Sequence, residues 1–219
     1  MKIFNILILI SIIPLVGVML LILIPGRYNS YCFNAALFIS SLTFILSLIM
    51  WLIFDSGHNS FQFLCTIDWL PAFNFYYTVG VDGISLFFLI LTTFLIMVCV
   101  LISWGSINYR LKEYLINFLL LEFLLIQVFS VLDLLLFYVF FESILMPMFL
   151  IIGIWGSRER KIRAAYQFFL YTLVGSVLML LGILIIYSHG GTTDLQMLWN
   201  LEFSEKKQIF LWVSFFLSF

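Results

Sequence analysis

Long apolar runs separated by short polar segments make up most of the chain. Six runs of about 20 residues, the length that crosses a bilayer as an α-helix, lie near residues 3–24, 33–54, 84–104, 114–131, 133–154 and 164–187. A seventh run begins near Gln208 and includes the last residue, Phe219. The pattern predicts an all-α, polytopic transmembrane helix bundle with six full spans and a truncated seventh, forming one transmembrane domain over residues 1–219.

Residues 55–83 are the one sizeable extramembrane stretch that this pattern leaves. The segment FQFLCTI within it alternates imperfectly between apolar and polar positions, which favours a short strand. Asp82 directly precedes the third span, where we expect its carboxylate to cap the first turn. The stretch is therefore predicted to be an extramembrane loop containing a strand.

Composition supports a membrane protein and removes several other classes. The chain is 64% hydrophobic and 10% charged, with a mean hydropathy of +1.20, whereas soluble domains are about 45–50% apolar. A net charge of −1 provides no basic field for nucleic acid. Cys32, Cys65 and Cys99 are scattered singly, which argues against a metal site or a disulfide framework. The first apolar run is too long for a cleaved signal, and we expect it to stay as a membrane anchor.

The positions of the cationic residues predict the orientation in the membrane. Three of the ten Lys and Arg residues lie on the side of the N-terminus, and the other seven lie in the odd-numbered loops on the opposite side: Arg27, Arg110, Lys112, Arg158, Arg160, Lys161 and Arg163. Positive residues favour the matrix or cytoplasmic face. The N-terminus and the loop 55–83 are therefore predicted to face outward, and the cluster RERKIR is explained by topology or by an anionic lipid or partner site.

One carboxylate lies in the middle of an apolar span. Glu142 is central in DLLLFYVFFESILMPMFLIIG, and Pro147 follows it by five residues. A charged side chain at this depth costs roughly 2.5–3.5 kcal/mol on insertion-based scales, and proline removes a backbone donor from the helix beyond it. Glu142 is thus a candidate proton or ion site, or a polar residue tolerated inside a helix bundle.

A second carboxylate is predicted at the same depth. Spans four and five meet at a very short turn around Leu132, so they should form an antiparallel hairpin. Glu122 lies ten residues before Leu132 and Glu142 ten residues after it, so each lies about 15 Å from the turn. Asp133 lies at the turn itself, where we expect it to be a helix cap. Desolvation and mutual repulsion would oppose ionisation of both acids. No Lys or Arg lies at matching depth in the sequence, so a cation would have to come from elsewhere.

Other chemistry is sparse. His58 and His189 both lie in loops, which argues against a pair of haem ligands, and no Gly-rich phosphate loop is present. The sequence therefore predicts no metal or cofactor site in this chain.

Three segments carry a resemblance to a known family. GVDGISLFFLILTTFLI, LDLLLFYVFFESILMPMFLIIGIWGSRERKIRAAYQFFLYTLVGS and SEKKQIFLWVSFFLSF closely resemble the antiporter-like membrane subunits of mitochondrial NADH:ubiquinone oxidoreductase, respiratory complex I. The resemblance covers nearly the whole chain. It implies a proton-pumping subunit of the mitochondrial inner membrane, with the N-terminus in the intermembrane space. Its partners would be other membrane-arm subunits and lipids, while FMN, iron–sulfur clusters and ubiquinone would belong to other subunits.

The resemblance also assigns roles to the two acids. The family's essential glutamate on the fifth span falls on Glu142, and the acidic residue of span four falls on Glu122. Family members have fourteen spans in two inverted repeats, and their glutamate pairs with a lysine on the seventh span. This chain ends before that lysine, so we expect an N-terminal fragment of a split subunit completed by a second chain; an incomplete product is the other interpretation. Alternative functions are a cation/proton antiporter subunit and a structural assembly subunit without a proton path.

Overall fold

The computed structural model describes residues 5–26, 28–58, 60–70, 75–107, 109–199 and 201–218. The helices in this part of the chain are α1 Ile6–Leu23, α2 Asn29–Ile53, α3 Gly83–Ile102, α4 Leu111–Ser130, α5 Leu134–Trp155, α6 Lys161–Gly190, α7 Leu195–Leu198 and α8 Glu205–Ser218, and the strands are β1 Gln62–Leu70 and β2 Phe75–Val81. Lys2, Arg27 and the ends of the first and seventh expected spans fall outside the described residues.

Two compact units make up the chain. The first comprises Met1–Leu64 and Gly80–Ser130, and the second comprises Cys65–Val79 and Val131–Phe219. The first thus holds helices α1 to α4, and the second holds α5 to α8 with most of the small sheet formed by β1 and β2.

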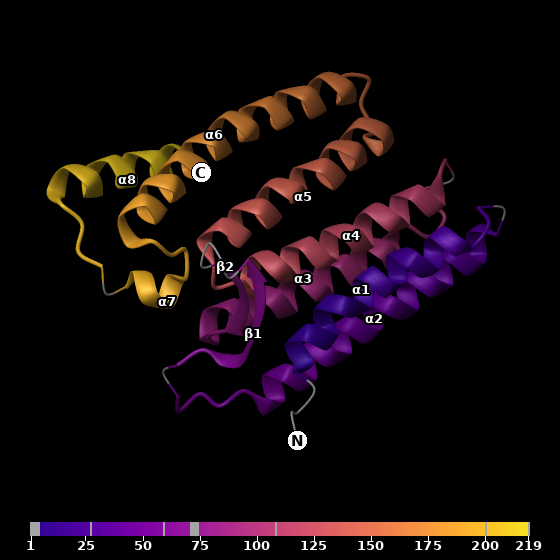
Figure 1. Ribbon diagram of the computed structural model, residues 1–219. Helices are drawn as coiled ribbons and strands as arrows, with labels where there is room; N and C mark the ends of the chain where they lie inside the picture. Colours follow the sequence, from indigo (N-terminus) through magenta and orange to yellow (C-terminus); the bar gives the residue numbers. More distant parts are fainter. Residues whose placement is uncertain are drawn as a thin grey trace. The chain divides into compact units, whose positions relative to one another are not determined.

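In the first unit, four long helices pack side by side (Figure 1). Helix α1 packs against α2 and α4, and α3 also packs against α2 and α4. Gly17 allows the close approach of α1, because a Cβ there would lie 2.9 Å from the Ile39 side chain and 3.0 Å from that of Leu119. The core of this unit therefore depends on a small residue as well as on buried leucine and isoleucine side chains.

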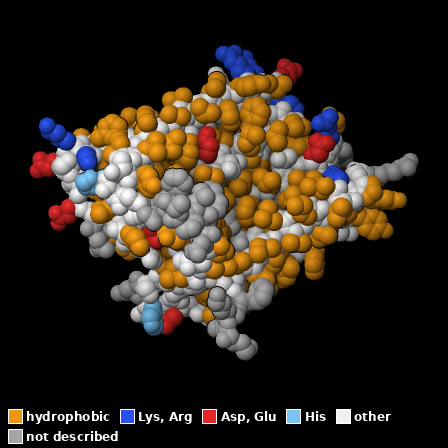
Figure 2. All heavy atoms as spheres, in the orientation of Figure 1, with side chains coloured by type: hydrophobic (Ala, Val, Ile, Leu, Met, Phe, Trp, Pro, Cys, Tyr) orange, Lys and Arg blue, Asp and Glu red, His pale blue; other side chains and the backbone are white. Residues whose placement is uncertain are grey.

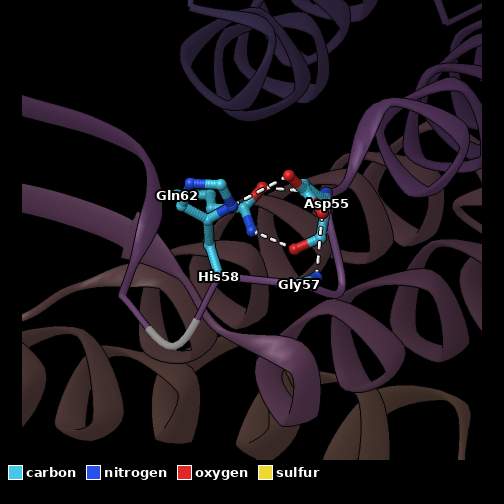
Figure 3. A network of polar contacts seen from close by, with 4 residues as sticks. All are labelled: Asp55, Gly57, His58 and Gln62. Carbon is cyan, nitrogen blue, oxygen red and sulfur yellow. Dashed lines mark hydrogen bonds and ion pairs between the residues drawn. The ribbon is translucent and has the colours of Figure 1, made fainter.

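Polar side chains order the connection between α2 and β1. Asp55 Oδ1 accepts a hydrogen bond from the Gly57 amide at 2.8 Å, and its Oδ2 lies 2.8 Å from His58 Nδ1 (Figure 3). The Gln62 side chain donates to the Asp55 carbonyl at 2.5 Å and accepts from the Asp55 amide at 3.1 Å. These bonds are all exposed, so they shape a surface loop rather than a site.

In the second unit, the start of α5 is held by a buried junction. Asp133 caps α5 by accepting from the amides of Leu135 and Leu136 at 2.9 and 3.0 Å, and its other oxygen accepts from Thr193 Oγ1 at 2.5 Å. Backbone bonds join Leu132 to Thr78 and Leu195 to Leu132, each at 2.9 Å. The expected caps Asp133 and Asp82 are both confirmed, and Asp82 forms a capping box with Ser85.

Two lysines cap the ends of helices, which explains part of the basic clusters. Lys112 Nζ donates to the carbonyls of Ile22 and Ile24, at 2.9 and 2.8 Å, where α1 ends. Lys161 Nζ donates to the carbonyl of Ile154, at 2.6 Å, where α5 ends. Cations at C-terminal carbonyls satisfy orphan acceptors and oppose the negative end of the helix dipole.

Six helices, α1 to α6, are long and apolar enough to cross a membrane within the described part of the chain. Hydrophobic side chains cover much of the visible surface, and the charged groups are few and mostly gathered in small clusters (Figure 2). The exposed apolar residues include Leu52 at 82% and Leu23 at 78% exposure. The predicted helical membrane bundle is confirmed. The structure also has features that the pattern did not reveal: strand β2, the short α7, and an α6 that begins at Lys161 and ends at Gly190.

Candidate functional site

Helix α5 carries Glu142 in its interior. The helix starts at Leu134, directly after the Asp133 cap, so Glu142 lies eight residues along it, or about 12 Å. Pro147 lies within the same helix and is buried. Because proline has no N–H, the carbonyl of Ser143, next to Glu142, lacks its usual partner four residues later. The polar groups of this stretch therefore include the backbone carbonyl of Ser143 as well as the side chain of Glu142.

One oxygen of the Glu142 carboxyl group has no hydrogen-bond partner. This atom, Oε2, is shielded from solvent and meets no donor or acceptor among the described residues, although the residue as a whole is half-buried. A shielded polar atom without a partner is costly to bury, so its presence inside an apolar helix needs a functional explanation.

Glu122 has a different environment in the first unit. It is fully buried, with 0% exposure, on α4. Its Oε1 lies 2.5 Å from Thr43 Oγ1 on α2, while its Oε2 has no hydrogen-bond partner among the described residues. Each of the two acids therefore combines a shielded, unbonded oxygen with a position inside a membrane-crossing helix.

The position of each acid along its own helix agrees with the spacing argument. Glu122 lies eight residues before the end of α4 at Ser130, and Glu142 lies eight residues after the start of α5 at Leu134. Each is thus about 12 Å from the three-residue connection. Equal depth of the two acids stays a prediction, since they belong to different units.

No cation neutralises either acid within the described residues. The ion pairs found there are Asp55 with His58 and Arg110 with Glu113, and all four side chains are at least half exposed. The same part of the chain holds no group of three or more His, Cys, Asp or Glu side chains that could bind a metal.

Buried hydroxyls near Glu122 were missed by the sequence analysis. Ser40, Thr43, Ser47 and Thr93 are all fully buried, and Ser47 lies 2.9 Å from Thr93 across α2 and α3. A signal was present, because residues 40, 43 and 47 recur at the three- and four-residue spacing of one helix face within an apolar span.

Comparison with known proteins gives consistent relatives. Residues 131–219 match the family "NADH:quinone oxidoreductase/Mrp antiporter, TM". The chain is 65% identical over 219 residues to NADH-ubiquinone oxidoreductase chain 4 of Chondrus crispus, covering 100% of this chain and 44% of that protein. It is 56% identical over 206 residues to NADH-ubiquinone oxidoreductase chain 4 of Arabidopsis thaliana, and the match covers 94% of this chain and 42% of that protein.

A solved structure shares the fold. It is "Respiratory complex I from Thermus thermophilus with bound NADH", which matches with a TM-score of 0.82 and 29% identity over 97% of this chain and 43% of that chain. The chain thus spans less than half the length of the relatives that it matches.

Proposed function

Because this chain is homologous to NADH-ubiquinone oxidoreductase chain 4, we propose that it is a proton-translocating subunit in the membrane arm of respiratory complex I. Its partners would be other membrane-arm subunits and membrane lipids. The location would be the mitochondrial inner membrane, with the N-terminus in the intermembrane space. The chain would carry no redox group, so electron transfer from NADH to ubiquinone would occur elsewhere in the enzyme.

The observation that carries this proposal is the shielded, unbonded Oε2 of Glu142 in the interior of α5. As a neutral acid the group avoids the cost of a buried charge, and as a carboxylate it requires a cation. A cation brought close by redox-driven rearrangement would favour the carboxylate and release the proton, and its withdrawal would favour proton uptake. Each such transfer works against about 2.3 kcal/mol per charge per 100 mV.

Glu122 would be the second acid of this process. Its full burial and single hydroxyl partner give it the same choice between a neutral and a charged form. If the two acids lie at equal depth, their protonation would be coupled, so that one carries the proton while the other is charged.

Replacement of Glu142 by Gln in the assembled enzyme tests the proposal. Glu142→Gln keeps the size of the side chain and removes its titration, so assembly on a native gel should be unchanged. Protons pumped per NADH oxidised should fall by at least about tenfold, the effect of losing one essential proton-transfer group. Glu159→Gln, at an exposed position before α6, is the matched control and should pump normally. Normal pumping by the assembled Glu142→Gln enzyme would reject the role.

A second candidate function comes from the name of the matching family, which includes Mrp antiporters. The same acids would then exchange protons for a cation such as sodium without a redox partner. Purification of the chain with its natural partners separates the two functions. Flavin and iron–sulfur proteins in the purified assembly support the respiratory enzyme, whereas sodium-dependent proton flux without them supports the antiporter.

A further inference from the structure

The Thr43 hydroxyl lies within hydrogen-bond distance of two acceptors. Its Oγ1 is 2.5 Å from Glu122 Oε1 and 2.8 Å from the carbonyl oxygen of Ser40 on its own helix. Thr43 and Glu122 are both fully buried, so solvent water does not compete for these hydrogen bonds. Since a hydroxyl has one proton, Thr43 can donate to only one of the two oxygens at a time.

The protonation of Glu122 decides which bond is made. When Glu122 is ionised, Thr43 donates to Oε1. When Glu122 is neutral and carries its proton on Oε1, the acid donates to Thr43, and the Thr43 proton turns to the Ser40 carbonyl. Only the hydroxyl proton rotates between these two arrangements, so the heavy atoms stay in place. The Thr43 proton is conserved, and the single proton gained or lost belongs to Glu122.

Other titratable groups in this unit lie away from Glu122. Helix α4 packs against α1, α2 and α3, and the described residues of α1 include no ionisable side chain. The other ionisable side chains of α2, α3 and α4 lie close to a helix end, away from the middle of α4 where Glu122 lies: Tyr31 and Cys32 on α2, Cys99 on α3, and Lys112, Glu113 and Tyr114 on α4. Within the described part of the unit, the Thr43 hydroxyl is the hydrogen-bond partner found for the Glu122 carboxyl group.

The two oxygens of Glu122 are thereby made unequal. Oε1 is held by Thr43, whereas Oε2 is shielded and has no partner among the described residues. A carboxyl group anchored through one oxygen presents the other in a fixed direction. Oε1, the oxygen that Thr43 contacts, is thus the one whose protonation turns the hydroxyl.

From this geometry we propose that Thr43 is a positioning residue for Glu122, whose hydroxyl proton reverses direction whenever Glu122 gains or loses a proton. The proposal rests on the proposed function, in which Glu122 changes protonation during turnover. The reversal couples the acid on α4 to the backbone of α2.

The test compares four variants in the assembled complex. Thr43→Val keeps the shape of the side chain and removes the hydroxyl, and Thr43→Ser restores a hydroxyl. Thr92→Val is the matched control, because Thr92 is also buried and its hydroxyl donates to the Phe88 carbonyl of its own helix at 2.7 Å. Glu122→Gln identifies the infrared C=O stretch of the Glu122 acid as the band that it abolishes.

Thr43→Val should move this C=O band to higher frequency, because the acid loses its hydrogen-bond partner, and Thr43→Ser should return it. Proton pumping in Thr43→Val should fall about fivefold with an altered pH profile, the effect expected from one lost hydrogen bond. Thr92→Val should change neither the C=O band nor proton pumping. If Thr43→Val does not assemble, Thr43→Cys, with its weaker donor, provides the same comparison.

Two results would overturn the proposal. One is an unmoved band in an assembled Thr43→Val complex. The other is a wild-type spectrum without a band that Glu122→Gln removes, since Glu122 would then stay ionised and the hydroxyl would not reverse. Normal pumping by Glu122→Gln would instead reject the role of Glu122 in pumping. The band shift would still report the Thr43 contact, so the two failures are distinguishable.

Discussion

At the scale of single residues, acids that cap helices differ from acids inside helices. Asp82, Asp133 and Asp194 each precede a helix and accept hydrogen bonds from amides of its first turn, so their position is explained by capping. Glu122 and Glu142 lie in the interior of α4 and α5, where they cap no first turn. The two glutamates are therefore the acids whose placement needs an explanation other than local structure.

Asp55 gives a prediction about pH at this scale. The Gly57 amide and then the His58 ring hold the pKa of Asp55 below its ordinary value. Because the folded-state pKa is lowered, these bonds order the loop above the ordinary aspartate pKa and are lost as the pH falls through the lowered value. The carboxyl ¹³C signal of Asp55 should titrate below that of the same aspartate in a peptide of this loop.

His58→Gln should bring the Asp55 titration only part of the way back, since the Gly57 amide is the larger cause of the shift. Equal midpoints in the protein and the peptide would show that the network of Figure 3 does not form in solution.

At the scale of elements, glycines set how closely helices approach. Helix α8 packs against α6, and a Cβ at Gly175 would lie 2.8 Å from the backbone oxygen of Ser218. A backbone atom cannot turn aside as a side chain can. The contact between α6 and α8 therefore requires a residue without a Cβ at position 175.

Gly175→Ala should weaken the docking of α8. The added methyl group overpacks the contact, and we expect a loss of about 1–3 kcal/mol in the free energy of unfolding, measured by denaturant titration in detergent. Gly153→Ala is the matched control, because its Cβ would meet Ala165 at an ordinary 3.7 Å. The control should be neutral or stabilising, and equal losses from the two variants would contradict the close contact.

At the scale of the whole molecule, the apolar surface and the basic clusters place the chain in a membrane. Six helices can cross it, and Lys112 and Lys161 serve both as cationic residues of one side and as caps of α1 and α5. The same residues thus stabilise helix ends and favour one orientation.

The predicted orientation can be tested with thiol reagents that do not cross membranes. His58→Cys, at a side chain that is 70% exposed, should be labelled from the intermembrane-space side. Glu159→Cys, in the basic cluster before α6, should be labelled from the matrix side. Labelling in detergent controls for burial by other subunits, and reversed labelling of the pair would show that the N-terminus faces the matrix.

The sequence alone determined the features that depend on local chemistry. Apolar run length predicted the six membrane-crossing helices, since a bilayer sets the length of its spans. Capping preferences predicted the roles of Asp82 and Asp133, and the resemblance singled out Glu142 and Glu122. The segment FQFLCTI was predicted as a strand and lies largely in β1. These features follow from short-range spacing, which one sequence displays directly.

Only the tertiary structure decided which distant residues meet. The contact of Thr43 with Glu122 joins positions 79 residues apart, and that of Thr193 with Asp133 joins positions 60 apart. The partners of Lys112 likewise lie in a chain segment far away in the sequence. Periodicity places a polar residue on a helix face, but the rotation and pairing of helices select its partner. Those depend on the packing of all side chains together.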